Sequence, residues 1–129
     1  MNPITEDYLR KFGRLLQEAE EMIEAGFYEA AGRNAYLAAL HAANAAIFEK
    51  TGCAIGKHKS TPQALASILH AENIHDKTLT AFLPRMMRFK EIADYETGGE
   101  GISQSVAEND VEEARVFNQR VKTLAEGLT

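Results

Sequence analysis

Two arginines and one tyrosine recur along one face of a predicted helix in the second half of the chain. Arg85, Arg88 and Tyr95 follow one another at spacings of three and seven residues, and Ile92 shares their face. A guanidinium group presents a planar fork of N–H donors that matches the oxygens of a phosphate. Two interpretations of the stripe stay open: a salt-bridged dimer surface, or an anion-binding site for phosphate at a dimer cleft. Asp94, beside the stripe, is expected to have a structural role.

All four histidines, at positions 41, 58, 70 and 75, precede Arg88. Their position matters because imidazole accepts a proton near neutral pH, whereas arginine only stabilises negative charge. A tyrosine hydroxyl, with an ordinary pKa of about 10, is a poor base unless its surroundings change that pKa strongly. His41 stands in an alanine-rich segment, where we expect a hydrogen-bonded and partly buried histidine. The alternative is that His41 lines the same cleft as Arg88.

Glu72 and His75 have the Glu-x-x-His spacing that is used in di-metal helical bundles. That chemistry requires two such motifs and two further glutamates on facing helices, and the chain has one copy in an expected loop. Cys53 has no acid or base at helical spacing that could activate it as a nucleophile. The sequence therefore predicts neither a metal site nor a cofactor.

The chain has 129 residues, with 19 acidic and 14 basic side chains and one cysteine. This length fits a single domain over residues 1–129, and one cysteine excludes an intrachain disulfide framework. The net charge of −5 argues against non-specific DNA binding. No basic segment leads into an apolar one, as it would in a signal peptide, and the most apolar stretch, 35–48, is too short to span a membrane. We therefore expect a cytoplasmic protein without membrane contact.

Apolar residues recur at helical spacing in five segments, and no run alternates with the period of two that is typical of a strand. Thr5 is the predicted N-cap of the first helix, and Asp76 that of the fourth. Asn109 and Glu112 have the capping-box spacing that predicts the start of the last helix. The expected fold is all-α, an antiparallel up-and-down bundle of about five helices, four long and one short. The expected helices cover about 5–25, 27–51, 60–70, 76–96 and 109–128.

Four segments taken in order resemble the HEPN-domain family, from about residue 8 to residue 124. The first, FYEAAGRNAYLAALHAANAAIFEKTG, resembles the second helix of the family, and KHKSTPQAL resembles the lead into the third. RFKEIADYE resembles the segment near the end of the fourth helix where an Arg precedes Ala-Asp-Tyr, and NDVEEARVFNQRVKTL is similar to the last helix. The resemblance implies an up-and-down helical bundle that usually forms a homodimer.

The resemblance also implies chemistry on RNA or nucleotides. Many members are ribonucleases or toxins, often paired with a minimal nucleotidyltransferase, and others bind nucleotides or serve as accessory modules. The active ribonucleases carry an Arg that is followed, after four to six residues, by a His in a cleft across the dimer. Arg88 matches that Arg, but Ala93 stands at the His position and Phe89 replaces the polar residue that commonly follows the Arg. Tyr95 matches a Tyr that lies two residues past the His in some active members.

The leading interpretation is therefore a small homodimeric HEPN-like protein without ribonuclease chemistry, acting as a binding or toxin–antitoxin component with a nucleotidyltransferase partner. The first alternative is a divergent ribonuclease that uses Arg88 and Tyr95, with His41 as a further candidate. The second alternative is a nucleotide-binding module. A nucleotide or RNA ligand would in these cases contact Arg85, Arg88 and Tyr95.

Overall fold

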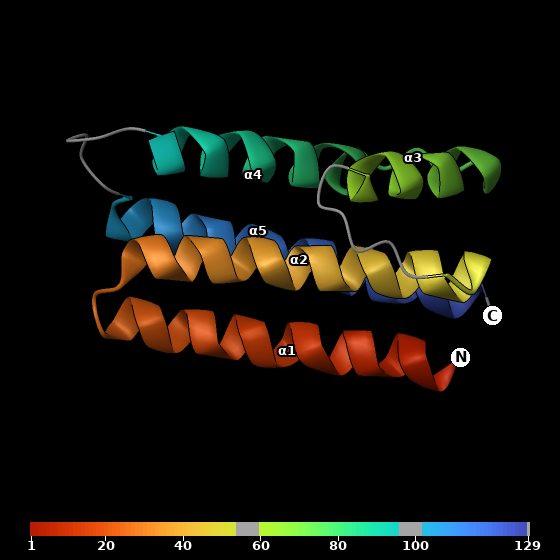
Figure 1. Cartoon of the computed structure of the whole chain (residues 1–129), viewed down its shortest axis with the longest axis horizontal. Helices are drawn as coiled ribbons and strands as arrows, with labels where there is room; N and C mark the ends of the chain where they lie inside the picture. The colour runs from red at the N-terminus through yellow and green to blue at the C-terminus, as the bar shows by residue number, and fades with distance from the viewer. Residues whose placement is uncertain (54–59, 96–101, 129) are drawn as a thin grey trace.

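The computed structural model describes residues 1–53, 60–95 and 102–128, and the side chains of 88–95 lie outside the described part. The described residues form five α-helices and no strand (Figure 1). Four of these helices have 19 to 24 residues and one has 11, which confirms the predicted all-α bundle. None of them, as far as they are described, is long and apolar enough to cross a membrane. The helices are α1 (Pro3–Glu24), α2 (Tyr28–Thr51), α3 (Thr61–Ala71), α4 (Lys77–Tyr95) and α5 (Gln104–Gly127).

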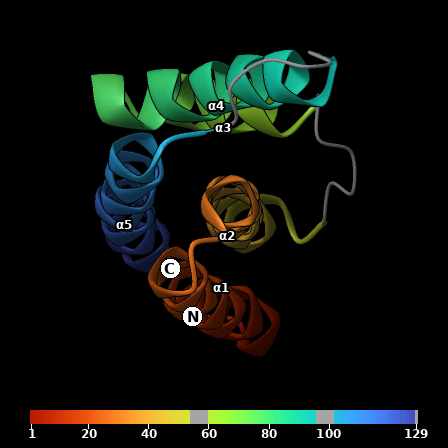
Figure 2. The same ribbon diagram turned by 90° about the vertical axis from the view of Figure 1, so that its left-hand side faces the viewer.

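Helix α2 lies at the centre of the bundle (Figure 2). Helices α1 and α5 pack against it, while α3 and α4 form a layer over another of its sides. In Figure 1, α1 and α4 run in one direction and α2 and α5 run in the other, so successive long helices are antiparallel. Because α1 and α4 lie on opposite sides of α2, a side chain of α2 that faces α1 points away from α4.

Alanine dominates the buried surface of α2. Because alanine has a one-carbon side chain and the highest helix propensity, α2 forms readily and lets its neighbours approach closely. Larger buried side chains from those neighbours fill the core, among them Leu16 of α1, Leu83 of α4 and Phe117 of α5. The Phe117 ring stacks on the Phe82 ring with their centroids 5.0 Å apart, which joins α5 to α4. The fully buried alanines of α2 are Ala31, Ala35, Ala38, Ala39, Ala42, Ala43, Ala45 and Ala46.

The N-terminus of α1 differs from the prediction, since Asn2 and not Thr5 is its N-cap. Asn2 Oδ1 accepts a hydrogen bond from the backbone N–H of Ile4 at 2.8 Å. Thr5 lies inside the helix, is fully buried and donates its hydroxyl to Glu49 Oε2 of α2 at 2.9 Å. Asparagine caps a helix at least as well as threonine, which explains why Asn2 can replace Thr5 as the cap. Because a buried hydroxyl needs a hydrogen-bond partner, Thr5 instead bonds to Glu49 and fixes α1 against α2. Gly52 ends α2 with a φ of 72°, as its position after the predicted helix indicates.

Helix α5 begins earlier than the sequence predicts. Ser103 caps it by accepting a hydrogen bond from the backbone N–H of Val106 at 3.3 Å, so the predicted start at Asn109 is wrong. Asn109 instead lies within the helix and donates to Glu113 Oε1 at 3.0 Å. Its spacing from Glu112 is ambiguous, because residues three apart also share a face inside a helix. The earlier start lengthens α5 by about one and a half turns.

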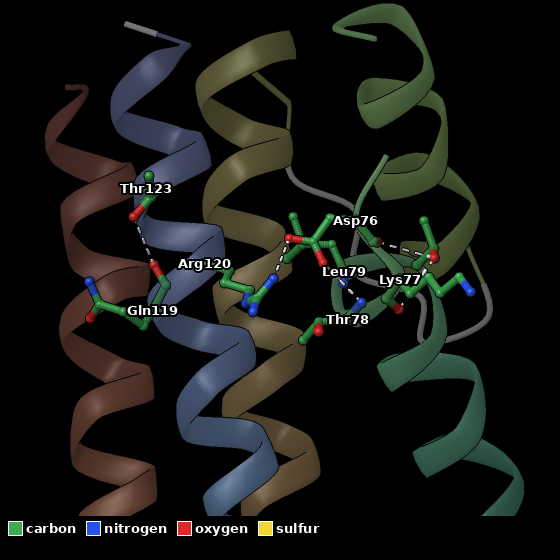
Figure 3. Close-up of polar contacts among 8 residues, drawn as sticks. Asp76, Lys77, Thr78, Leu79, Gln119, Arg120 and Thr123 are labelled. Carbon is green, nitrogen blue, oxygen red and sulfur yellow. Dashed lines mark hydrogen bonds and ion pairs between the residues drawn. The ribbon is translucent and has the colours of Figure 1, made fainter. Parts of the chain in front are cut away.

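Asp76 caps α4, as predicted. Its Oδ1 accepts hydrogen bonds from the backbone N–H groups of Thr78 at 2.9 Å and Leu79 at 3.4 Å. Its Oδ2 accepts a hydrogen bond from Arg120 Nη1 of α5 at 2.8 Å (Figure 3). Burial by itself would raise the pKa of Asp76, but these donors together hold that pKa below its ordinary value. One carboxylate thus fixes both the start of α4 and its contact with α5.

Candidate functional site

Arg85 lies on the face of α4 that meets α5. Its guanidinium group forms an ion pair with the Glu113 carboxylate, and its central carbon lies 5.6 Å from the centroid of the Phe82 ring. The side chain is 51% exposed. The Glu113 carboxylate therefore partly neutralises the positive charge of Arg85, on which the predicted anion binding depends. Because a guanidinium group carries five N–H donors, the exposed part of Arg85 keeps donors for a ligand.

Asp110, one turn before Glu113 on α5, is a buried carboxylate. Only 4% of its surface is exposed, and no hydrogen bond from the described residues reaches its Oδ2. Burial raises the pKa of Asp110, and the nearby charge of Arg85 opposes that rise without cancelling it. Carboxylates in this situation are rare, because an ionised group that loses its hydration and gains no donor is costly. A group of this kind is a candidate for a functional role.

Gly32 of α2 provides the room that brings α5 this close. A Cβ atom at position 32 would lie 3.3 Å from Ile102 Cδ1 and 3.6 Å from Asp110 Oδ2. The first turns of the two helices are also tied together, because the Tyr28 hydroxyl donates to Gln104 Oε1 at 3.2 Å. The enclosed oxygen of Asp110 therefore faces the backbone of α2, on the side away from solvent.

A cavity opens between α4 and the first turns of α5, and Asp110 forms part of its wall. Its volume is about 360 Å³, at the small end of the range of about 300–1,000 Å³ that is usual for ligand sites. We call it the Arg85–Asp110 pocket. Arg85 of α4 and Asp110 of α5 both contribute to its lining. The lining residues are Arg85, Met86, Ser105, Val106, Asn109 and Asp110.

Three of the predicted site residues follow Arg85 on α4. The backbone of Arg88 lies about one turn further along the helix, and Tyr95 is its last residue. The side chains of Arg88, Asp94 and Tyr95 lie outside the described residues. Their part in an anion-binding site therefore stays a prediction, whereas the placement of Arg85 is established by its contacts with Glu113 and Phe82.

His41 lies on the side of α2 that faces α1. Its ring is half-buried and stacks on the ring of Tyr8, with the two centroids 6.2 Å apart. Because α1 and α4 lie on opposite sides of α2 (Figure 2), one chain does not bring His41 beside Arg85. The partial burial of His41 agrees with the prediction for a histidine in this alanine-rich helix. Its place at a cleft between two copies of the chain stays a prediction.

The Glu72–His75 segment forms the end of α3 and the turn that follows it. Glu72 Oε1 accepts a hydrogen bond from Lys50 Nζ of α2 at 2.7 Å, so this carboxylate links α3 to α2. In the part of the chain that the structure describes, no three His, Cys, Asp or Glu side chains lie close enough together to hold a metal ion. His58 stands within residues 54–59, which lie outside the described part of the chain.

The sequence pattern singles out Arg85 but neither of its acidic neighbours, Asp110 and Glu113. A signal for Asp110 does exist, since it stands four residues before Ala114 and seven before Phe117, both in the apolar stripe of the last helix. A charged residue in such a stripe indicates a buried polar site. The expected helix start at Asn109 conceals this signal, because it assigns Asp110 to a first turn, where acidic residues are common.

Comparison with known protein families gives a match over nearly the whole chain. The model of the HEPN domain matches residues 5–127, nearly the whole chain, and so includes all of α2, α3, α4 and the Arg85–Asp110 pocket. No curated protein is similar enough to this chain to count as a match. Because the matched region covers far more than half of the sequence, the chain belongs to the HEPN domain family.

Proposed function

We propose that this chain is a homodimeric HEPN protein that acts as the binding component of a two-part system, with a minimal nucleotidyltransferase as its partner. It does not cleave RNA in the way of the ribonucleases of the family. One observation carries the proposal. In a chain that matches the HEPN domain over residues 5–127, Ala93 stands where those ribonucleases have the His that follows Arg88. Residues 1–129 then act as a single domain.

The chemistry of RNA cleavage explains why this one position matters. Cleavage through the 2′-hydroxyl requires a group that accepts its proton and a group that stabilises the charge on the phosphate. Arg88 or Arg85 can supply the second function but not the first. Among the described histidines, His41 packs against α1, His70 lies in the last turn of α3 and His75 precedes α4. These positions support a protein that lacks a base beside its arginines.

The ligand in this proposal is a nucleotide or RNA that contacts Arg85, Arg88 and Tyr95 at the cleft between two copies. The ion pair of Arg85 with Glu113 supports a specific role over a general one, because a compensated arginine attracts polyanions weakly at long range. The net charge of −5 acts in the same direction. Recognition then depends on the shape and hydrogen bonding of the ligand more than on its charge.

RNA cleavage by wild type, Arg88→Ala and Ala93→His tests the loss of ribonuclease chemistry. Wild type and Arg88→Ala should leave a labelled single-stranded RNA intact. Ala93→His, which restores the family's spacing after Arg88, should gain cleavage. Cleavage by wild type that disappears in Arg88→Ala would contradict the proposal and indicate a divergent ribonuclease that uses Arg88 and Tyr95. Cleavage that survives Arg88→Ala indicates a contaminating nuclease or a different site.

Light scattering and co-purification test the two assembly claims separately. At micromolar concentration the particle mass should be twice the 14.2 kDa of the chain, and a monomer would contradict the dimer. A tagged chain should co-purify with the nucleotidyltransferase encoded by a neighbouring reading frame. A genomic neighbourhood without such a reading frame, together with no complex on co-expression, would contradict the partnership.

A further inference from the structure

We propose that a second pocket, at the start of α4, binds a small uncharged alcohol, a molecule with an apolar body and one hydroxyl group. The pocket lies between the turn after α3, the first turn of α4 and the last turns of α5, and its volume is about 370 Å³. We call it the Asp76–Arg120 pocket. The inference does not rest on the proposed function, which concerns the arginines further along α4.

Aliphatic side chains make up much of the lining of this pocket. Leu79 and Leu124 are 4% and 7% exposed and belong to the hydrophobic core. Ile74 and Leu128 are partly exposed and pack against that core. A ligand body that enters the pocket therefore extends the core, and the burial of its apolar surface drives binding.

The fold holds the walls of the pocket in place from two sides. Asn73 has a φ of 56°, and the backbone N–H of Ile74 donates to the carbonyl oxygen of Leu69 at 2.8 Å. This is a Schellman motif, which asparagine can form because it tolerates the left-handed conformation. The Asp76–Arg120 ion pair, at 2.8 Å, fixes the start of α4 against α5 (Figure 3). A ligand therefore finds a preformed site and does not have to order it.

The charges at the pocket select an uncharged ligand. The three charged side chains of its lining are all in ion pairs, Asp76 with Arg120 and Glu72 with Lys50 of α2 at 2.7 Å. An anionic head group that approached Arg120 would also approach Asp76, and a cationic group would meet the reverse arrangement. A hydroxyl group suits such a pair, because it can accept from a guanidinium N–H and donate to a carboxylate oxygen. Arg120 donates to Asp76 from Nη1 and is 50% exposed, so it keeps further N–H groups for a ligand.

Gly127 leaves one side of the pocket without a side chain. It lies in the last turn of α5 and lines the pocket, and a Cβ atom there would meet no described atom within 4 Å. Its backbone is helical and does not have the positive φ that favours glycine. A larger residue is therefore compatible with the backbone, and its side chain would occupy the space beside the pocket.

Titration of the isotope-labelled full chain with 1-hexanol, hexanoate and hexylamine, followed by two-dimensional NMR, tests the choice of ligand. Hexanol should shift the amide signals of Leu79, Leu124 and Gly127 in a saturable way. It should bind about tenfold more tightly than either charged analogue, because burying a charge costs more than burying a hydroxyl group. Tightest binding of hexanoate would identify an anion site, and tightest binding of hexylamine a cation site. Either result, or the absence of saturable shifts, would overturn the proposal.

The length of the alcohol tests whether its apolar body is buried. From 1-butanol to 1-hexanol the affinity should rise about fourfold with each added CH₂ group, as expected when each group leaves water. An affinity that does not change with chain length would mean that the body of the ligand stays in solvent. That result would contradict binding within the pocket.

Gly127→Leu tests the location of the site, with Gly13→Leu as its matched control. Both glycines are helical and have no described atom within 4 Å of an added Cβ, but Gly13 lies on α1 and does not line the pocket. Gly127→Leu should abolish the saturable shifts with hexanol, and Gly13→Leu should leave the affinity unchanged. Circular dichroism confirms that both variants are folded. Unchanged binding in Gly127→Leu would overturn the assignment to this pocket.

Light scattering distinguishes a ligand site from a contact between copies of the chain. Gly127→Leu should have the same particle mass as wild type. A lower mass would show that the pocket receives a second copy, which would overturn this inference. A wild-type dimer that binds none of the three probes would also overturn it, and would leave the proposed function intact.

Discussion

Asp76 and Asp110 are two aspartates at the contact between α4 and α5, and their surroundings are opposite. Asp76 accepts hydrogen bonds from two backbone N–H groups and from Arg120, and its pKa is held low. Asp110 is more deeply buried, its Oδ2 receives no hydrogen bond from the described residues, and its pKa is raised. The aspartate at the start of α4 thus has several donors, whereas the one near the middle of α4 has a buried oxygen to which no described residue donates.

This difference separates a structural carboxylate from a candidate functional one. A carboxylate with its full set of donors contributes to stability and has nothing left to offer a ligand. A buried carboxylate without donors reduces stability, and such residues persist where a ligand or a reaction uses them. The sequence does not distinguish the carboxylate that has its donors from the one that lacks them, because both aspartates stand near the starts of predicted helices.

The largest expected effect is at Asp76. Asp76→Ala removes the cap of α4 and the ion pair with Arg120, and should lower the free energy of unfolding by about 1–2 kcal/mol in chemical denaturation. Asp76→Asn is the matched control, because asparagine caps a helix about as well as aspartate and should recover most of the loss. An equal loss in both variants would mean that the ion pair, and not the cap, provides the stability.

The second effect has the opposite sign. Asp110→Asn removes a buried charge at nearly constant volume and should raise the free energy of unfolding by about 1 kcal/mol at neutral pH without ligand. Chemical denaturation in nucleotide-free buffer measures the change. A destabilised variant would show that Asp110 is a structural partner of Arg85, and the contrast with Asp76 would then disappear.

The pH dependence of these two variants sharpens the comparison. Asp110 has a raised pKa, so its contribution is complete below the ordinary value of 3.8 and is lost as the pH rises through its folded pKa. Asp76 has a lowered pKa, so its contribution is present above 3.8 and is lost as the pH falls through its folded pKa. As the pH falls, the stability that Asp110→Asn gains over wild type should therefore be lost before the pH reaches 3.8. The stability that Asp76→Asn lacks relative to wild type should still be missing at a pH just below 3.8. Thermal unfolding across this range would contradict the assignment if both differences vanished together.

The smallest effect compares two helical glycines, one beside Asp110 and one remote from it. Gly13→Ala should stabilise the protein by about 0.5–1 kcal/mol, since nothing lies within 4 Å of the added Cβ and alanine favours the helix. Gly32→Ala should gain less than half of that, because its Cβ meets Ile102 Cδ1 at 3.3 Å. Thermal unfolding measures both changes. Equal gains would indicate that α2 and α5 can separate slightly at no cost.

The helices and their buried faces could largely be predicted from the sequence. Leu79, Phe82, Leu83 and Met86 form a predicted core stripe of the fourth helix, and all are buried. This prediction succeeds because helical spacing is a local property of the chain. The helix starts are less predictable, since Asn2 and Ser103 compete with other residues that can also cap. The choice between them depends on which polar side chains the neighbouring helices bury.

The candidate site also has one residue that the sequence predicts and several that it does not. The type and spacing of Arg85 mark it as a site residue, and its helix is predicted correctly. Its partners could not be found in this way, because Glu113 and Asp110 come from a different helix, α5, and Gly32 comes from the first half of the chain. His41 shows the reverse case. Its residue type suggests chemistry, and packing turns it towards Tyr8 on the other side of α2.

The sequence by itself determined the all-α bundle, the resemblance to the HEPN family and the absence of a histidine after Arg88, because each of these depends on residue order alone. The tertiary structure decided that Arg85 faces two carboxylates, that Asp110 is buried and that His41 lies against α1. The physical reason is that local spacing sets which face of a helix a side chain occupies. The surroundings of that face, and so its charge and hydration, depend on which distant helix packs against it.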